Sequence, residues 1–148
     1  MSLTNQAELD LLDLYFTNVD APNIGDAAGL QNSAAAGSLQ ISLHTAALSD
    51  TDTLSTASEA AYTSYAREIV GRAIADWTVA GATATCDNDN QLDFVTATGG
   101  SETETYFGLT MQATGDYLQL WGALTSGLAV SNGITPSFAA QALAITLD

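Results

Sequence analysis

The stretch Ser38-Leu39-Gln40-Ile41-Ser42-Leu43-His44 determines how the rest of the chain is interpreted. Leu39, Ile41 and Leu43 alternate with polar residues, and in a β-strand successive side chains point to opposite faces. We therefore predict a strand over residues 38–44, with one face buried and the other in contact with water. His44 falls on the polar phase, so we expect it to be an exposed strand residue.

Short segments of similar composition recur after this stretch, and turn-forming clusters separate them. Short strands at a spacing of about ten residues are typical of sandwiches, jelly rolls and small barrels. We predict a mainly β protein: an antiparallel β-sandwich or jelly roll, or a small barrel, with a short N-terminal α-helix. The further predicted strands are residues 66–75, 77–79, 82–86, 92–96, 103–111, 117–124 and 143–147. The turn clusters are residues 80–81, 87–90, 99–100, 114–116 and 131–133.

Two segments carry helix-start signals. Asn5 followed three residues later by Glu8 is the pattern of a capping box, and it predicts a helix over residues 5 to about 18. Thr56-Ala57-Ser58-Glu59 repeats the pattern and predicts a short helix or turn near residues 60–64.

An apolar stripe of Leu9, Leu12 and Phe16 runs along the first predicted helix. Such a face packs against the chain's own core, which is the commoner outcome, or against a partner. We therefore keep these three residues as the candidate partner-binding set. We expect residues 1–37 to form the helix and a connecting arm, which could lie on a neighbouring subunit, and residues 38–148 to form the β domain, the whole being one compact unit.

The predicted core consists of residues on the apolar phases of the predicted strands. They are Leu39, Ile41, Leu43, Ile69, Trp77, Phe94, Phe107, Leu109, Leu118, Leu120, Leu143, Ile145 and Leu147.

The charge balance is strongly negative. Seventeen acidic residues stand against two basic ones, Arg67 and Arg72, and the formal net charge is −15. Such a surface repels phosphate backbones and anionic lipids, so we expect no nucleic-acid partner and no membrane partner. Solubility under crowding, adaptation to high salt and drift of a tolerant surface all remain open as reasons for the acidity.

Length and cysteine content indicate an ordinary domain. A chain of 148 residues can bury a sufficient core without disulfides or metals. Cys86 is the single cysteine, so no intramolecular disulfide is possible, and we expect a buried free thiol. Residues 1–8 contain neither a basic region nor an apolar run, and no stretch approaches the ~20 apolar residues of a membrane span. We expect a soluble protein without a secretory signal.

Nucleophilic catalysis finds no support in the residues. His44 is the only histidine, so a histidine-based triad has a single possible base and a two-histidine metal centre cannot form. Asp87 and Asp89 lie beside Cys86 and would raise its pKa, which disfavours a reactive thiolate. We therefore expect no catalytic residues and no enzymatic activity.

Acidic clusters are the remaining candidates for binding chemistry. Asp87, Asp89 and Asp93 resemble the alternating oxygen ligands of a calcium loop, but the central glycine and the closing glutamate of such a loop are absent. A hairpin turn explains residues 87–93 better. The pairs Asp10/Asp13 and Glu102/Glu104 share a face each, and we expect them to be solvated acidic faces and not a glycosidase pair. No metal and no cofactor is expected.

Several short pieces follow one another along nearly the whole chain. They include the Leu-rich opening helix, residues 38–45, Glu59 with residues 62–67, residues 98–103, residues 107–109, residues 120–124, residues 130–133, residues 138–140 and residues 143–147. This ordered set resembles small structural proteins of tailed bacteriophages, whose pattern runs "LHT", then "E…Y.GYAR". The chain departs from the pattern at Ser64, where glycine is usual before Tyr-Ala-Arg, and in its acidic turn.

The recurring pieces have scaffold roles. We expect Tyr62, Tyr65, Phe107 and Trp121 to be apolar anchors of the core. Arg67 is expected to satisfy a carboxylate or a strand-end carbonyl.

The resemblance implies a structural virion protein. Its members are head-decoration, virion-surface or tail-fibre-like proteins. We expect an outer-surface capsid-stabilising protein that forms homotrimers on the head shell, with the major capsid protein of the same phage as its partner. A tail-fibre-like or receptor-binding virion module is the alternative.

Overall fold

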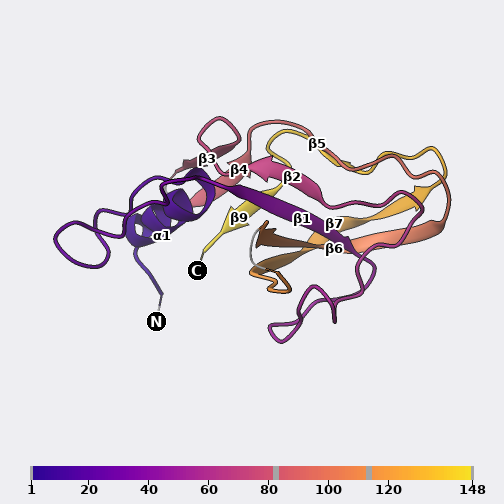
Figure 1. Ribbon diagram of the computed structural model, residues 1–148, viewed down its shortest axis with the longest axis horizontal. Coiled ribbons are helices and arrows are strands. Elements are labelled where there is room, and N and C mark those ends of the chain that lie inside the picture. Colours follow the sequence, from indigo (N-terminus) through magenta and orange to yellow (C-terminus); the bar gives the residue numbers. More distant parts are fainter. Residues whose placement is uncertain (1, 82–83, 113–114, 148) are drawn as a thin grey trace. The chain divides into compact units, whose positions relative to one another are not determined.

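The computed structural model describes residues 2–81, 84–112 and 115–147 (Figure 1). Antiparallel strands dominate it, and helix is confined to the N-terminal region. The helical segments are α1 (Asn5–Leu12) and the π-helical turn η1 (Asp13–Thr17). The strands are β1 (Ser38–His44), β2 (Glu68–Gly71), β3 (Trp77–Ala80), β4 (Thr85–Asn88), β5 (Leu92–Asp93), β6 (Ser101–Met111), β7 (Leu120–Ser131), β8 (Ser137–Phe138) and β9 (Ala144–Thr146).

The strands form three sheets, with the orders β2-β1-β6-β7, β3-β4-β9 and β5-β8. The mainly β, antiparallel prediction with a short N-terminal helix is confirmed. Over the described ranges the sheets do not close into a barrel, so that alternative is not the one adopted.

Contacts divide the chain into two compact units. Unit 1 contains residues 1–37, 71–91 and 138–148, and unit 2 contains residues 38–70 and 92–137. One of the divisions between the units falls after residue 37. The β part, however, is shared between both units, because two later segments return to pack with the N-terminal region. Sequence patterns do not reveal such a return, since it depends on pairing between distant segments.

Unit 1 is built where α1 and η1 pack on β3 and β4. Leu12 and Phe16 are 1% and 0% exposed, and Phe16 lies 4.9 Å from the buried ring of Trp77, centroid to centroid. Leu9 is half-buried. Two residues of the candidate partner-binding stripe are therefore covered by their own chain, which is the commoner of the two outcomes expected for such a stripe.

The helix starts differently from the predicted capping box. Thr4 is the N-cap residue and makes no side-chain cap, and Asn5 is the first residue inside α1. The carboxylate of Glu8 is buried, so it does not serve as the exposed arm of a box, while the Glu8 amide donates to the Thr4 carbonyl at 3.0 Å.

The ends of several predicted strands also differ from those in the structure. The predicted strand 66–75 shortens to β2, 92–96 shortens to β5, and 117–124 becomes the much longer β7. The predicted strand 82–86 corresponds to β4. Residues 82–83, and residue 114 of a predicted turn, lie outside the described residues. At residues 60–64 the structure has a turn, with the Tyr65 amide donating to the Tyr62 carbonyl at 2.9 Å, as the turn alternative predicted. No helix forms there, and the Glu59 carboxylate binds side chains downstream.

Arg72 ties the helical segment of unit 1 to the connecting arm. Its guanidinium donates to the carbonyl of Tyr15 at 2.6 Å, to that of Ala36 at 3.0 Å and to that of Leu14. Arg72 is only 7% exposed, and burial lowers its pKa. The guanidinium holds several N–H donors in one plane and can therefore bond to several carbonyls at once, which a lysine ammonium cannot do in the same geometry.

We predict that Arg72→Met lowers the free energy of unfolding by about 3 kcal/mol, because buried carbonyls lose a charged donor. Urea unfolding followed by circular dichroism measures the change. Arg72→Lys keeps the charge without the fork and should lose less. A cost below about 0.5 kcal/mol for Arg72→Met, the level of an ordinary surface change, would show that the guanidinium does not hold this region.

Unit 2 is organised by β1 and β6. Leu39 pairs with Met111 and His44 pairs with Tyr106 at the two ends of their register. β7 then pairs with β6, with a register shift between Glu104 and Tyr106. Figure 1 shows β6 and β7 running side by side over their length.

Most of the predicted core is buried. Ile69 is wrong at 49% exposed: β2 is a short edge strand and its neighbour Val70, 6% exposed, occupies the inward phase. Four further residues are only half-buried: Phe107, Leu120, Ile145 and Leu147. The confirmed core residues are Leu39, Ile41, Leu43, Trp77, Phe94, Leu109, Leu118 and Leu143.

Ser64 has a left-handed backbone, with φ of 82°. This conformation favours glycine, the residue that the resembling proteins carry at this place, because a Cβ atom raises its energy. The hydroxyl of Ser64 is 2.5 Å from that of Thr98, and both residues are exposed.

We predict that Ser64→Gly raises the free energy of unfolding by about 1 kcal/mol, since it removes the Cβ penalty. Ser64→Ala is the matched control: it removes the same hydroxyl but keeps the Cβ atom. Thermal or urea unfolding of both variants isolates the backbone contribution. Equal stability of the two variants would contradict the proposed strain.

Candidate functional site

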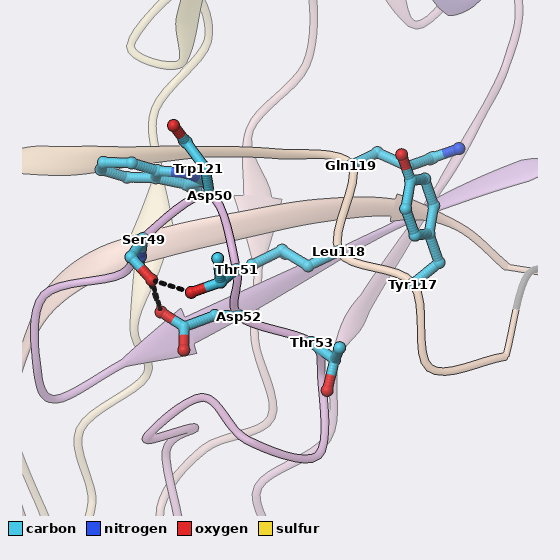
Figure 2. Close-up of a pocket in the computed structure, with 9 residues that line it drawn as sticks. All are labelled: Ser49, Asp50, Thr51, Asp52, Thr53, Tyr117, Leu118, Gln119 and Trp121. Atoms are coloured by element: carbon cyan, nitrogen blue, oxygen red, sulfur yellow. Dashed lines mark hydrogen bonds between the residues drawn. The ribbon is translucent and has the colours of Figure 1, made fainter.

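A groove of about 330 Å³ opens within unit 2 between two chain segments (Figure 2). One segment is the loop that follows β1, and the other leads into β7. The lining residues are Ser49, Asp50, Thr51, Asp52, Thr53, Tyr117, Leu118, Gln119 and Trp121.

The loop that forms the first wall is held by hydrogen bonds among its own residues. The Asp52 carboxylate accepts hydrogen bonds from the Ser49 amide at 2.6 Å and from the Ser49 hydroxyl at 2.9 Å. The hydroxyls of Ser49 and Thr51 lie 3.1 Å apart. Figure 2 marks the two contacts that the Ser49 hydroxyl makes, to Thr51 and to Asp52. A short side chain that satisfies nearby amides fixes a tight turn.

The second segment is clamped to the first. Asp116 accepts hydrogen bonds from the amide of Ser55 at 2.6 Å and from its hydroxyl at 2.5 Å. The Asp116 carbonyl accepts from the Leu54 amide at 3.1 Å. The hydrogen bond from the Ser55 hydroxyl contributes most to lowering the pKa of the Asp116 carboxylate, and that from the Ser55 amide adds to it. The groove walls are thus held together by a carboxylate that is ionised at neutral pH.

A small apolar cluster supports the groove from below. Leu48, Leu54 and Leu118 are buried together, and Tyr106 packs against them. Tyr106 also lies 6.1 Å from Trp121, ring centroid to ring centroid. The loops therefore rest on packed side chains, which preorganises the groove.

Two aromatic side chains stand exposed at the groove. Tyr117 is 62% exposed and Trp121 is 39% exposed. Figure 2 shows the two rings apart from one another, with Asp50 beside Trp121 and Gln119 beside Tyr117. The prediction that Trp121 anchors the core is wrong. The signal was nonetheless present: Leu120 pairs with the buried Leu109, and a period of two then directs Trp121 to the other face of the strand.

His44 is completely buried, which corrects its prediction as an exposed residue. Its Nε2 lies 2.8 Å from the Ser42 hydroxyl, and its Nδ1 has no hydrogen-bond partner. A Cβ atom at Gly108 would lie 2.9 Å from this Nε2, so glycine makes room for the ring. Burial lowers the pKa of His44, which keeps the imidazole neutral.

Beside His44, a polar cluster joins distant residues. Arg67 forms a two-pronged ion pair with Glu59, with both nitrogen–oxygen distances at 2.7 Å. The hydroxyl of Tyr65 donates to Glu59 at 2.8 Å and accepts from the Leu43 amide at 3.1 Å. Burial raises the pKa of Tyr65. The expectation that Arg67 satisfies a carboxylate is confirmed, and the cluster joins the segment after β1 to the edge of the sheet.

The acidic turn at residues 87–93 is not a hairpin. β4 pairs with β3 and β9, whereas β5 pairs with β8, so the turn connects different sheets. Asn88 is buried and joins segments: its amide donates to the carbonyl of Ala139 at 2.9 Å and accepts from the Leu143 amide at 2.8 Å. Cys86 is a buried free thiol as predicted, and burial raises its pKa.

Asp10 and Asp13, which we predicted to form a solvated pair, accept hydrogen bonds from other residues of the chain. Asp10 accepts from Gln6 at 2.7 Å and from Asn23 at 2.8 Å, and the bond from Asn23 contributes most to lowering its pKa. The Asp13 carboxylate accepts a hydrogen bond from the Thr17 hydroxyl at 3.2 Å, and burial raises the pKa of Asp13. Asp10 is also buried, which corrects the prediction of a solvated pair.

Glu102 and Glu104 differ sharply in environment. Glu102 accepts hydrogen bonds from the amides of Ala61 and Tyr62 at 2.9 and 2.7 Å. Glu104 is 0% exposed, and neither of its oxygens has a donor. Burial raises the pKa of Glu104 to about 7, with the neighbouring Glu102 adding to the shift. Protonation supplies the missing donor, because a neutral Glu104 can donate to Glu102.

We predict that stability falls as pH rises from about 4.5 to 7. The folded pKa of Glu104 is raised, so the folded protein binds one more proton than the unfolded chain in that window. Glu104→Gln should remove this slope and be more stable than wild type by about 2 kcal/mol at pH 8.

Urea unfolding at several pH values measures the effect. Asp50→Asn, an exposed residue with the same change in charge, is the control and should keep the slope. If Glu104→Gln and wild type show the same pH dependence, Glu104 ionises without cost and the assignment fails.

Residues 2–81, 84–112 and 115–147 contain no group of three or more His, Cys, Asp or Glu side chains placed to hold a metal ion. Within those ranges no helix has the length and apolar character needed to cross a membrane.

Residues 2–146 match the family model described as Podophage GP4 fiber I protein gp80. The chain belongs to this family. None of the curated proteins compared with the chain matches it. The fibre I gp80 family makes the chain a structural protein of a phage virion, as the resemblance implied.

Proposed function

We propose that this fibre-family protein is a non-catalytic adhesion module that uses the groove of unit 2 to hold a saccharide of the host surface. The observation that carries the proposal is the exposure of Tyr117 and Trp121 on a preorganised groove. Exposed aromatic rings at a concave site are typical of ligand binding, because they bury large area at low entropic cost.

The other groove residues indicate the class of ligand. Asp50, Asp52 and Gln119 offer carboxylate and amide oxygens, and three lining residues carry hydroxyls. Such a lining pairs with sugar hydroxyls, while the aromatic faces stack on the apolar face of a sugar ring. The groove contains no cation, so an anionic polysaccharide fits it poorly.

Binding of the purified protein to host cells tests this function. We expect Trp121→Ala and Tyr117→Ala each to weaken binding about tenfold, the consequence of losing ~1.4 kcal/mol of contact. Ile74→Ala is the control, since Ile74 is 73% exposed and lies outside the groove residues. Periodate treatment of the cells destroys vicinal diols and should abolish binding, whereas protease treatment should not.

The opposite pattern would overturn the proposal. Binding that survives periodate but is lost after protease treatment indicates a protein receptor. Unchanged binding by both aromatic variants would show that the groove is not the contact. Release of reducing ends from host polysaccharide by the purified chain would contradict a non-catalytic role.

A capsid-stabilising protein on the outer surface of the head is the second candidate. It is supported by the internal use of both arginines, Arg67 and Arg72, which leaves attachment to apolar and main-chain contacts. Such attachment to the major capsid protein should weaken little as salt rises. The number of copies per purified virion separates the two functions: hundreds indicate decoration, and a handful indicates a fibre.

A further inference from the structure

The groove of unit 2 carries negative charge that no cation of the chain balances. Two of its lining residues, Asp50 and Asp52, are acidic, and none is basic. The chain has only two basic residues, and both are used elsewhere. Arg67 forms its two-pronged ion pair, while Arg72 belongs to unit 1, where it donates to main-chain carbonyls. A positive group on the ligand is therefore the charge that the groove lacks.

The two lining carboxylates differ in what already binds them. Asp52 accepts the amide and the hydroxyl of Ser49 with its Oδ2 atom, at 2.6 and 2.9 Å, so this carboxylate holds the loop. Asp50 is exposed, and none of the described residues donates a hydrogen bond to its carboxylate or forms an ion pair with it. Because Asp52 orders the loop, the Asp50 carboxylate stands on a fixed backbone and is open to a ligand.

An aromatic face accompanies the open carboxylate. Asp50 and Trp121 both line the groove, and Figure 2 draws them beside one another. Trp121 is 39% exposed, and its ring is supported by that of Tyr106. The face of an indole attracts cations more strongly than that of any other aromatic side chain. A carboxylate and an indole at one site together favour a ligand that has both a positive charge and apolar surface.

A sugar with a free amino group has both features. Its ammonium offers three N–H donors to a carboxylate, and such charge-assisted bonds are stronger than those of a neutral hydroxyl. The apolar face of the sugar ring can stack on the indole. A neutral sugar would use the ring and leave the charge of Asp50 unmatched, and an anionic sugar would be repelled. The net charge of −15 also attracts a cationic ligand from a distance.

We propose that the saccharide bound by the groove carries a free amino group, as an unacetylated hexosamine does, and that its ammonium lies between the Asp50 carboxylate and the Trp121 ring. The inference rests on the proposed saccharide-binding function and adds the charge of the ligand to it. Trp121 contacts any sugar that stacks on it, whereas Asp50 selects the sugar whose nitrogen is charged.

Host cells treated first with protease and then with acetic anhydride provide the test. In mild aqueous buffer this reagent converts exposed amino groups into uncharged amides and leaves the sugar diols in place. We expect binding of the purified protein to fall at least tenfold, compared with cells that received protease alone. Binding to untreated cells should also weaken between about 0.1 and 1 M salt, because the Debye length shrinks to roughly 3 Å.

Asp50→Asn is the matched variant, since it keeps the size of the side chain and an oxygen acceptor but removes the charge. It should bind untreated cells about tenfold more weakly than wild type, which corresponds to ~1.4 kcal/mol, and should no longer respond to acetylation. Asp26→Asn makes the same change of charge at an exposed residue of unit 1 and should bind as wild type does. Circular dichroism should show that both variants are folded.

Failure of this inference is distinguishable from failure of the proposed function. Binding that is lost after periodate but survives acetylation retains the saccharide and overturns the amino group. Equal binding of untreated cells by wild type and Asp50→Asn contradicts the role of Asp50. Loss of binding in EDTA with recovery in calcium would show that a divalent cation occupies the groove in place of an ammonium. Binding that survives periodate counts against the proposed function itself.

Discussion

The scarcity of positive charge constrains how this protein holds itself together. Its two arginines are both used inside the structure: Arg67 pairs with Glu59, and Arg72 binds main-chain carbonyls around the helical segment. Arg72 joins segments that are far apart in the sequence, whereas Arg67 and Glu59 are eight residues apart. Because no lysine exists to replace either one, each arginine supports its own unit alone.

Apart from Glu59, the carboxylates whose partners are described above are held mainly by neutral donors in place of ion pairs. Asp52 is held by the amide and hydroxyl of Ser49, and Asp116 by those of Ser55. Glu102 relies on two backbone amides. The abundance of Ser, Thr and Asn thus has a structural reason, since these residues supply the hydrogen bonds that cations supply elsewhere. Glu104 is the exception, because it lacks even a neutral donor.

Uncharged surface stands out in a protein of this composition. The two groove aromatics, Tyr117 and Trp121, lie within residues 117–147, which contain no charged side chain, whereas the other wall of the groove carries Asp50 and Asp52. In a fibre-family protein, the uncharged stretch is a place where a neutral ligand can approach without repulsion.

The sequence by itself determined the fold class, the strand at residues 38–44, the position of the helix and the buried Cys86, because these follow from local periodicity and composition. The count of acidic and basic residues also predicted an acidic surface. Only the tertiary structure decided that His44 is buried, that Trp121 is exposed and that Asp10 is partnered by Asn23. Alternation assigns residues to two faces, but what covers each face depends on distant segments. The fate of a polar or aromatic residue is therefore settled only when those segments pack.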